Sequence, residues 1–377
     1  MIHYARSIVV ICLIIILYPA TMALAQPQSV PKLTERQLDK ASYVTLAKEW
    51  KTYIEKHGES AEALFNLGMA YYYSGEKEAA RVAGERAVEI DPDNPKALAF
   101  LAKILAKSQG EMDDALELLT RCREVAPYHE DGMITLAAIY LMRGELKKSE
   151  EVFKTMFDQR IISRPLQDHA YNMLVALPHG AVLITNGDND TFPPLALQAG
   201  MNFRNDVIVI NHHLLNGEEF AGALFKRYPS IRPRGNIKPD KNQSLSTTLL
   251  KRMVDEGKVP MYFATSVSFD DLGFSPQLTT EGINNRSSKD GLTAEESARL
   301  FFETYRMDSA TDWNFAWDLY PSHSHFMRNY VICMIDLVKD DEINLDTKQK
   351  LLSKASDIAT FHDMTLILYV IRSLQKK

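Results

Sequence analysis

The fold of the first half of the chain is decided by residues 61–94, which read AEALFNLGMAYYYSGEKEAARVAGERAVEIDPDN. Apolar and small residues recur at helical spacing on both sides of Gly75, and Pro92 follows the second apolar stretch. This pattern predicts two helices joined by a turn at Gly75, because glycine adopts the left-handed conformation that ends many helices. Gly68 and Ala80 are small enough to let the two helices approach. We therefore expect a tightly packed helical hairpin.

The pattern recurs twice. Residues 95–129 repeat it with one inserted residue near Gly110, and residues 130–163 repeat it with Ser149 in place of the usual alanine. The period of about 34 residues resembles that of the tetratricopeptide repeat family. The resemblance implies a helical array over residues 61–163, preceded at residues 26–60 by a linker and a capping helix. Such arrays commonly hold a peptide or protein partner on their concave face. A rigid brace for the second half of the chain is the alternative.

The hydrophobic pattern changes after the repeats. Continuously apolar runs at residues 181–184, 206–211 and 261–265 alternate with helical patterns, which is typical of a parallel sheet. We expect an α/β domain over residues 164–290 with a small, mostly parallel sheet. Helical patterns fill residues 291–377. The expected fold class is thus all-α repeats followed by an α/β domain and a helical C-terminal region.

Polar residues follow the first predicted strand. The heptapeptide Gly187-Asp188-Asn189-Asp190-Thr191-Phe192-Pro193 reads as a loop before a short helix that Pro193 and Pro194 open. Ligands of open α/β sheets bind outside the carboxyl ends of the strands. His212 lies at the end of the second strand and would be close by. The candidate ligand-binding residues are Asn186, Asp188, Asn189, Asp190, Thr191 and His212.

Two interpretations of this loop stay open. Asp188 and Asp190 could hold a divalent cation that in turn grips a phosphate. Alternatively, Asp190 or Thr191 caps the helix while Asp188 and Asn189 brace the turn. His212 and His213 are adjacent on a predicted strand, so we expect at most one of them to face the loop.

The amino-terminal residues 1–25 resemble a secretory signal. Arg6 precedes an apolar run over residues 8–17, and Ala23-Leu24-Ala25 provides a small-residue cleavage site. The apolar run is shorter than the roughly 20 residues of a spanning helix. We therefore expect export to a periplasmic or extracellular location, with cleavage favoured over an N-terminal membrane anchor. The formal net charge of −6 argues against a nucleic-acid partner, which calls for a basic face.

The second half also resembles a known family. The segments that carry this resemblance are residues 187–193, 204–211, 214–216, 261–264, 280–286 and 328–330. They are similar to the extracytoplasmic tail of multi-span membrane proteins related to protein O-mannosyltransferases. In that family the sugar transfer is assigned to a membrane-embedded module, which has no counterpart in this sequence. The resemblance therefore implies a shared domain rather than the activity, and work with an envelope or glycan-handling membrane complex.

Two functions remain. The first is an exported scaffold whose repeats bind a protein partner and whose α/β domain binds a small ligand. The alternative is a cation-dependent enzyme acting on a phosphorylated or sugar substrate at Asp188 and Asp190. No nucleophile elbow, phosphate-binding loop or zinc-protease motif occurs in the sequence.

Overall fold

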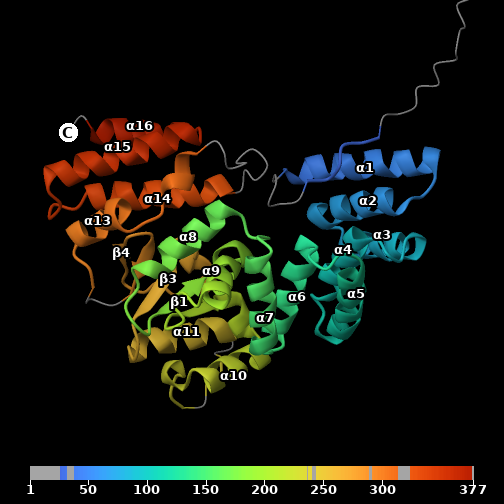
Figure 1. Cartoon of the computed structure of the whole chain (residues 1–377), viewed down its shortest axis with the longest axis horizontal. Coiled ribbons are helices and arrows are strands. Elements are labelled where there is room, and N and C mark those ends of the chain that lie inside the picture. Colours follow the sequence, from blue (N-terminus) through green and yellow to red (C-terminus); the bar gives the residue numbers. More distant parts are fainter. Residues whose placement is uncertain are drawn as a thin grey trace, which may run out of the picture.

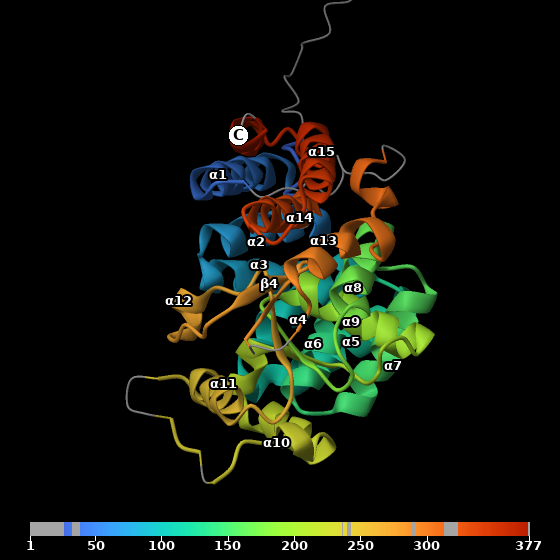
Figure 2. The same cartoon turned by 90° about the vertical axis from the view of Figure 1, so that its left-hand side faces the viewer.

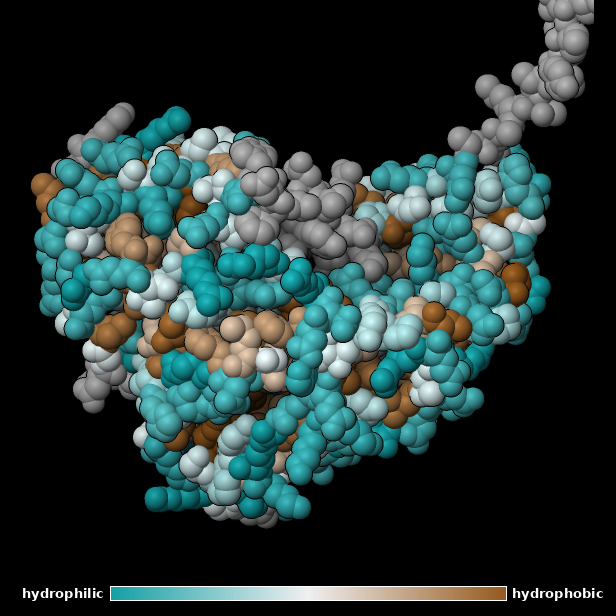
Figure 3. Space-filling model, in the orientation of Figure 1, coloured by the Kyte–Doolittle hydropathy of each residue, from teal (hydrophilic) through white to brown (hydrophobic). Residues whose placement is uncertain are grey.

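The computed structural model describes residues 26–31, 38–235, 237–239, 243–287, 291–312 and 323–375. The predicted export signal, residues 1–25, lies outside these ranges. In the described parts of the chain, no helix combines the length and the apolar character needed to cross a membrane. The surface seen in Figure 3 is mostly hydrophilic, with hydrophobic residues scattered over it.

The structure confirms the expected fold class: helical repeats, then a small sheet, then C-terminal helices. The first repeat helices lie at one end of the long axis and the C-terminal helices at the other, with the sheet below the C-terminal helices (Figure 1). The helices that precede the sheet are α1 (Lys40–His57), α2 (Ala61–Ser74), α3 (Lys77–Ile90), α4 (Pro95–Leu105), α5 (Met112–Val125), α6 (Glu130–Met142), α7 (Leu146–Asp158) and α8 (Arg164–Val175).

The close packing of the first helical pair follows from its small residues. A Cβ atom on Gly68 would lie 3.4 Å from the Ala80 carbonyl of α3 and 2.7 Å from the Phe100 ring of α4, so a larger residue would require this ring to shift. Ala80 of α3 is fully buried. Gly75 ends α2 with a φ of 94°, in the left-handed region that favours glycine. These three residues do what the sequence pattern predicted.

The sheet is mixed. Its strands are β1 (Val182–Thr185), β2 (Ile208–Asn211), β3 (Met261–Ala264), β4 (Thr279–Glu281) and β5 (Asn284–Arg286), in the order β2-β1-β3-β5-β4. β1 pairs in parallel with β2 and with β3, as expected. β4 and β5 form an antiparallel hairpin on β3, and neither strand was among the apolar runs that predicted the sheet. These strands are short and polar, so their sequence carries little periodicity.

Helices cover the sheet and complete the chain. They are α9 (Asp188–Met201), α10 (Glu218–Arg227), α11 (Leu245–Glu256), α12 (Phe269–Leu272), α13 (Ala294–Glu303), α14 (His323–Val338), α15 (Leu345–Phe361) and α16 (Thr365–Leu374). Short 3-10 helices lie at Gln109–Glu111, His212–Asn216, Pro229–Ile231 and Asp308–Thr311. From the side, the C-terminal helices lie above the α/β part (Figure 2).

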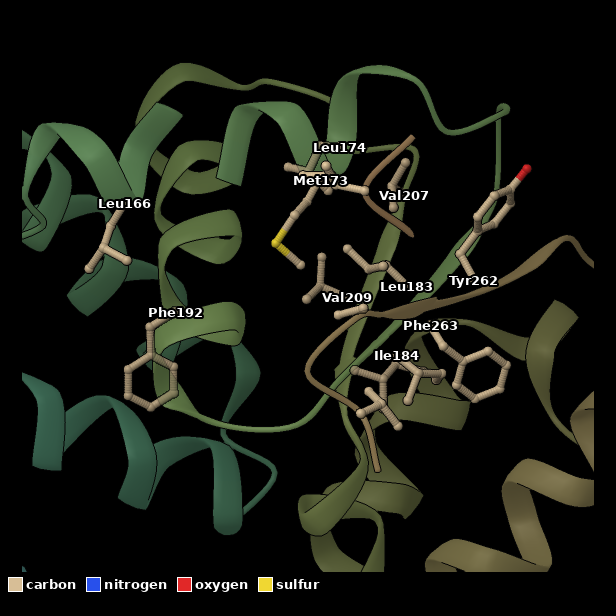
Figure 4. Packing of buried hydrophobic residues seen from close by; sticks show 14 of the residues in the cluster. Leu166, Met173, Leu174, Leu183, Ile184, Phe192, Val207, Val209, Tyr262 and Phe263 are labelled. Carbon is tan, nitrogen blue, oxygen red and sulfur yellow. The ribbon is translucent and has the colours of Figure 1, made fainter. Parts of the chain in front are cut away.

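One hydrophobic core runs from the second repeat through the sheet to the last helix. Figure 4 shows part of it, with Phe192 of α9 and Ile184 of β1 among its labelled side chains. The last repeat joins this core because α7 packs along α9. A Cβ on Gly200 would lie 2.3 Å from the ring of Phe157, so the two helices are as close as their side chains allow. The repeats are therefore fused to the α/β part rather than linked to it flexibly.

Candidate functional site between the repeats and the sheet

The path of the chain through the sheet marks one strand end. The chain runs from β1 outward to β2, then returns across β1 to β3 on the other side. A crevice forms at the carboxyl end of the strand where the direction reverses, and ligands of α/β sheets commonly bind there. β1 is that strand, and Asn186 follows it directly. The candidate residues therefore lie where this topology places a binding site.

The structure corrects the expected loop, because α9 begins at Asp188 and not at Pro193. Asp188, Asn189 and Asp190 form its first turn, and Gly187 is its N-cap residue. The two prolines lie inside the helix, where they remove backbone hydrogen bonds, but both are buried. Packing against the core thus overrides the local preference that placed the helix start at the prolines.

Asp190 holds the start of the helix together. Its Oδ1 accepts a hydrogen bond from the Gly187 amide at 2.7 Å, and its Oδ2 accepts one from the Asn186 amide at 2.9 Å. The Ser266 hydroxyl, beyond β3, also donates to Oδ2. A carboxylate at the third helical position that reaches back to the N-cap amide is one half of a capping box. Both oxygens of Asp190 are therefore engaged.

The environment of Asp190 opposes its ionisation. The side chain is 3% exposed, and burial raises the pKa of its carboxyl while the three hydrogen bonds lower it. Thr191 is buried beside it and donates from its hydroxyl to the Gly187 carbonyl at 2.6 Å. The same hydroxyl lies 2.7 Å from that of Thr185. Asp190 and Thr191 thus stabilise the turn from inside the helix, whereas the structural interpretation of the loop placed one of them at the N-cap and Asp188 and Asn189 as the braces.

Asp188 is different. Its side chain is exposed, and within the described residues it makes no hydrogen bond or ion pair. It nevertheless lies in a concave part of the surface, where the surrounding protein raises the pKa of its carboxyl. The charge of Asp190 raises this pKa further, while Lys103 and His213 lower it. Asp188 is thus the carboxylate of the pair that a ligand can reach.

Both histidines face the same amide, against the expectation that at most one would. The strand ends at Asn211, and residues His212–Asn216 form a 3-10 helix. This turn places the two rings side by side, with centroids 3.8 Å apart. The Asn186 Oδ1 lies 2.8 Å from Nε2 of His212 and 3.1 Å from Nε2 of His213. Adjacent side chains point to opposite faces only in an extended strand, and His212 and His213 lie in a 3-10 helix instead.

A groove runs between the repeats and this strand end. Its larger part is a cavity of about 370 Å³. One wall comes from the first helix of each repeat and the other from the start of α9, with Ser266 and Phe326 at the edge. The repeat wall consists of Phe65, Met69, Tyr73, Lys96, Ala99, Phe100, Lys103, Asp131 and Ile134. The first helices of the repeats and the turn at the end of β1, which the sequence analysis treated separately, therefore line one groove.

The groove continues past Asp188 into a second cavity of about 150 Å³. Ile134, Asp188 and Asn189 line both cavities. The remaining walls of the second cavity are largely apolar and come from α7, α8 and α9 and the turn before α8. They include Met156, Ile162, Leu166, Phe192 and Pro193.

The sequence analysis did not identify the residues of the repeat wall. The signal that could have found them is a stripe on the first helix of each repeat, such as Phe65, Met69 and Tyr73, which are four residues apart. Residues at that spacing share one helix face. Ser266 had no such signal, since only the fold brings it to Asp190.

A larger cavity, of about 500 Å³, lies elsewhere. It lies at the outer edge of β2, between α7, α9 and α10, and Thr191 alone of the candidate residues lines it. The pair Arg227 and Glu150 lies at its wall. Its size does not make it the better candidate, because the strand-end residues face the other groove.

Across the described ranges, no group of three or more His, Cys, Asp or Glu side chains is placed to hold a metal ion.

Two protein families match parts of the chain. The tetratricopeptide repeat family matches residues 61–94, which form α2 and α3. The family described as TMEM260-associated domain 2 matches residues 166–227, which run from α8 to α10 and include Asn186, Asp188 and His212. No curated protein matches the chain. The first match confirms the repeat interpretation, and the second shows that the strand-end residues lie within a recognised domain.

Proposed function

We propose that this protein is a scaffold that holds an extended segment of a partner protein in the groove between the repeats and the start of α9. Tetratricopeptide repeats generally present a concave surface to protein partners. The observation that supports the proposal is that the groove has a second wall in addition to the repeat helices. The turn at the carboxyl end of β1 provides a second wall, so a bound chain would be contacted from two sides.

The chemistry of the groove suits a peptide. Partly exposed aromatic and aliphatic side chains such as Phe65, Tyr73 and Ile134 offer contact area. The Asn189 side chain, at the opposite wall, offers both hydrogen-bond donors and acceptors. Binding sites for flexible ligands combine apolar anchors with a few polar groups in this way.

The geometry favours binding over the cation-dependent alternative. A cation shared by Asp188 and Asp190 would require Asp190 to exchange the amides of Asn186 and Gly187 and the hydroxyl of Ser266 for the ion. Those hydrogen bonds hold the start of α9. We therefore assign Asp190 to the structure and Asp188 to the ligand.

A photo-crosslinking experiment in cells tests the proposal. A photoreactive amino acid replaces Tyr73 in the groove, or Val82, which is 57% exposed on α3 outside the groove, as the matched control. We expect a specific protein to be captured from position 73 only. The captured partner should then bind Ile134→Arg at least about tenfold more weakly than wild type, and Val82→Arg equally well. Capture from both positions alike, or unchanged binding by Ile134→Arg, would contradict the proposal.

We also propose that the chain acts outside the cytoplasm, with a partner at a membrane or cell surface. The support is the pattern of residues 1–25 and the resemblance of the second half to extracytoplasmic domains. Fractionation and N-terminal sequencing of the expressed protein test it. We expect a mature chain that begins at Gln26 outside the cytoplasm. An intact chain in the cytoplasmic fraction would refute this part.

A further inference from the structure

Asp188 lies between the two cavities of the groove. Since it lines both of them together with Ile134 and Asn189, a chain that occupies both must pass this carboxylate. An extended peptide rises roughly 3.3 Å per residue and presents side chains alternately to opposite faces. It can therefore place one side chain in each cavity and a third beside Asp188, with the three side chains at every second residue on the same face of the peptide.

The two cavities select the same kind of side chain. The first is walled by Met69, Phe100 and their aromatic neighbours, and the second by Leu166 and Phe192 with other apolar residues. Burial of apolar area stabilises a complex by roughly 25 cal/mol per Å² before the costs of ordering. Each cavity thus favours an apolar side chain of the peptide.

Within the described residues, Asp188 is the one charged side chain that lines both cavities. The acids Glu130 and Asp131 of α6 line one cavity each, the second and the first respectively, and Lys103 of the first cavity lies near enough to Asp188 to lower the pKa of its carboxyl. Among the cationic residues, Lys96 and Lys103 line the first cavity and Arg160 lines the second. None of these three residues lines both cavities, as Asp188 does. Lys103 also lies 5.4 Å from the centre of the Tyr72 ring, in a cation–π contact.

We propose that the groove selects an extended peptide that carries a lysine or arginine opposite Asp188, with an apolar side chain on each side of that residue. This inference rests on the proposed peptide-binding function and names the chemistry of the partner segment. Asp188 contacts the ligand and determines its specificity, whereas Asp190 positions the turn. A cationic side chain complements the carboxylate in a place where the raised pKa of Asp188 indicates that protein crowds it.

A structural role for Asp188 makes a different prediction. A negative charge in the first turn of a helix interacts favourably with the helix dipole. If this were its only role, replacement of Asp188 would lower the melting temperature slightly and leave ligand selection unchanged. Glu78 provides the matched control, because it is an exposed acid in the first turn of α3 and does not line either cavity.

The test is selection from a random dodecapeptide library displayed on phage, with the purified protein as bait. Wild type, Asp188→Asn, Asp188→Lys and Glu78→Lys are compared after thermal unfolding has shown that each is folded. We expect wild type and Glu78→Lys to enrich peptides with a basic residue between two apolar ones. A synthetic peptide of that sequence should bind Asp188→Lys about tenfold more weakly. Its Lys→Glu version should recover binding to Asp188→Lys.

The outcomes separate the two proposals. Enriched peptides without a basic residue, or the same peptides with Asp188→Lys as with wild type, would overturn the assignment of Asp188 and leave a peptide groove in place. A failure of wild type to enrich any peptide would overturn the peptide-binding function itself.

Discussion

The Oδ1 atom of Asp190 accepts a hydrogen bond from the backbone amide of Gly187 at 2.7 Å, three residues earlier in the chain. This contact ties the end of β1 to the first turn of α9. It also separates the roles of two carboxylates that are almost adjacent in sequence, since Asp188 has no such bond within the described residues. The same strand end therefore contains one structural acid and one accessible acid.

Replacement of Asp190 should destabilise the fold, and replacement of Asp188 should not. Asp190→Ala leaves the amides of Asn186 and Gly187 without their acceptors in a partly buried turn. We expect a loss of about 2–3 kcal/mol in the free energy of unfolding, measured by urea denaturation. Asp188→Ala should change it by less than about 0.5 kcal/mol. Equal losses in both variants would contradict the separation of roles.

The ionised Asp206 carboxylate should stabilise the folded protein at neutral pH and lose this effect in strong acid. The guanidinium of Arg204 lowers the pKa of its carboxyl from 3.8 to about 2. A carboxyl with a lowered pKa in the folded state stabilises the protein above pH 3.8 and loses this contribution as pH falls towards 2. The pair is partly exposed, so solvent screening leaves about 1 kcal/mol.

Urea denaturation of wild type and Asp206→Asn at pH 6, 4, 3 and 2 measures this contribution. The wild type should be more stable at pH 6, and the difference should shrink between pH 4 and pH 2. Other acids, such as Glu296, also have lowered pKa values, so only the difference between the two proteins is informative. A difference that stays constant with pH would refute the ion-pair explanation.

Gly200→Ala should weaken the packing of the last repeat on the α/β part. The new methyl group would overlap the ring of Phe157, and overpacking of this kind costs about 1–3 kcal/mol. Gly222→Ala in α10 is the control, because nothing lies within 4 Å of its Cβ position. There the gain in helix propensity should stabilise the protein by about 0.5–1 kcal/mol.

A double-mutant cycle checks the cause of the Gly200→Ala effect. Phe157→Ala removes the ring atoms nearest to the added methyl group but keeps the Cβ of residue 157, 2.8 Å away, so in this background Gly200→Ala should destabilise the protein less than it does in the wild type. If the cost were as large without the Phe157 ring as with it, contact between this ring and residue 200 would not be its origin.

Tyr330→Phe should loosen the attachment of α14 to α8. The Tyr330 hydroxyl accepts a hydrogen bond from Nδ2 of Asn172 at 2.9 Å and lies 3.1 Å from Nδ1 of His169. Burial lowers the pKa of His169 to about 3, so its ring is neutral at pH 7 and can accept from the hydroxyl. We expect a loss of about 1–2 kcal/mol, measured as a shift in thermal unfolding. Tyr369→Phe, at a side chain that is 77% exposed, should show no shift.

The repeats could be predicted from local sequence, because each helical hairpin contacts mainly its neighbours. Gly68, Gly75 and Ala80 occupy positions where size or backbone conformation excludes most other residues. The three parallel strands were also predictable, since buried strands form continuous apolar runs. The hairpin β4–β5 was not, because its pairing depends on β3 and not on its own short, polar segments.

The helical repeats, the parallel strands and the polar residues that follow β1 could thus be identified from local sequence patterns alone. The role of each polar residue depends on which distant segments pack against it. Ser266, brought to Asp190 by β3, helps to make that carboxylate structural, and α4 brings Lys103 towards Asp188. The physical reason is range: periodicity and turn chemistry act over a few residues, whereas the groove is formed by segments that are distant in sequence and meet only through packing of the shared core.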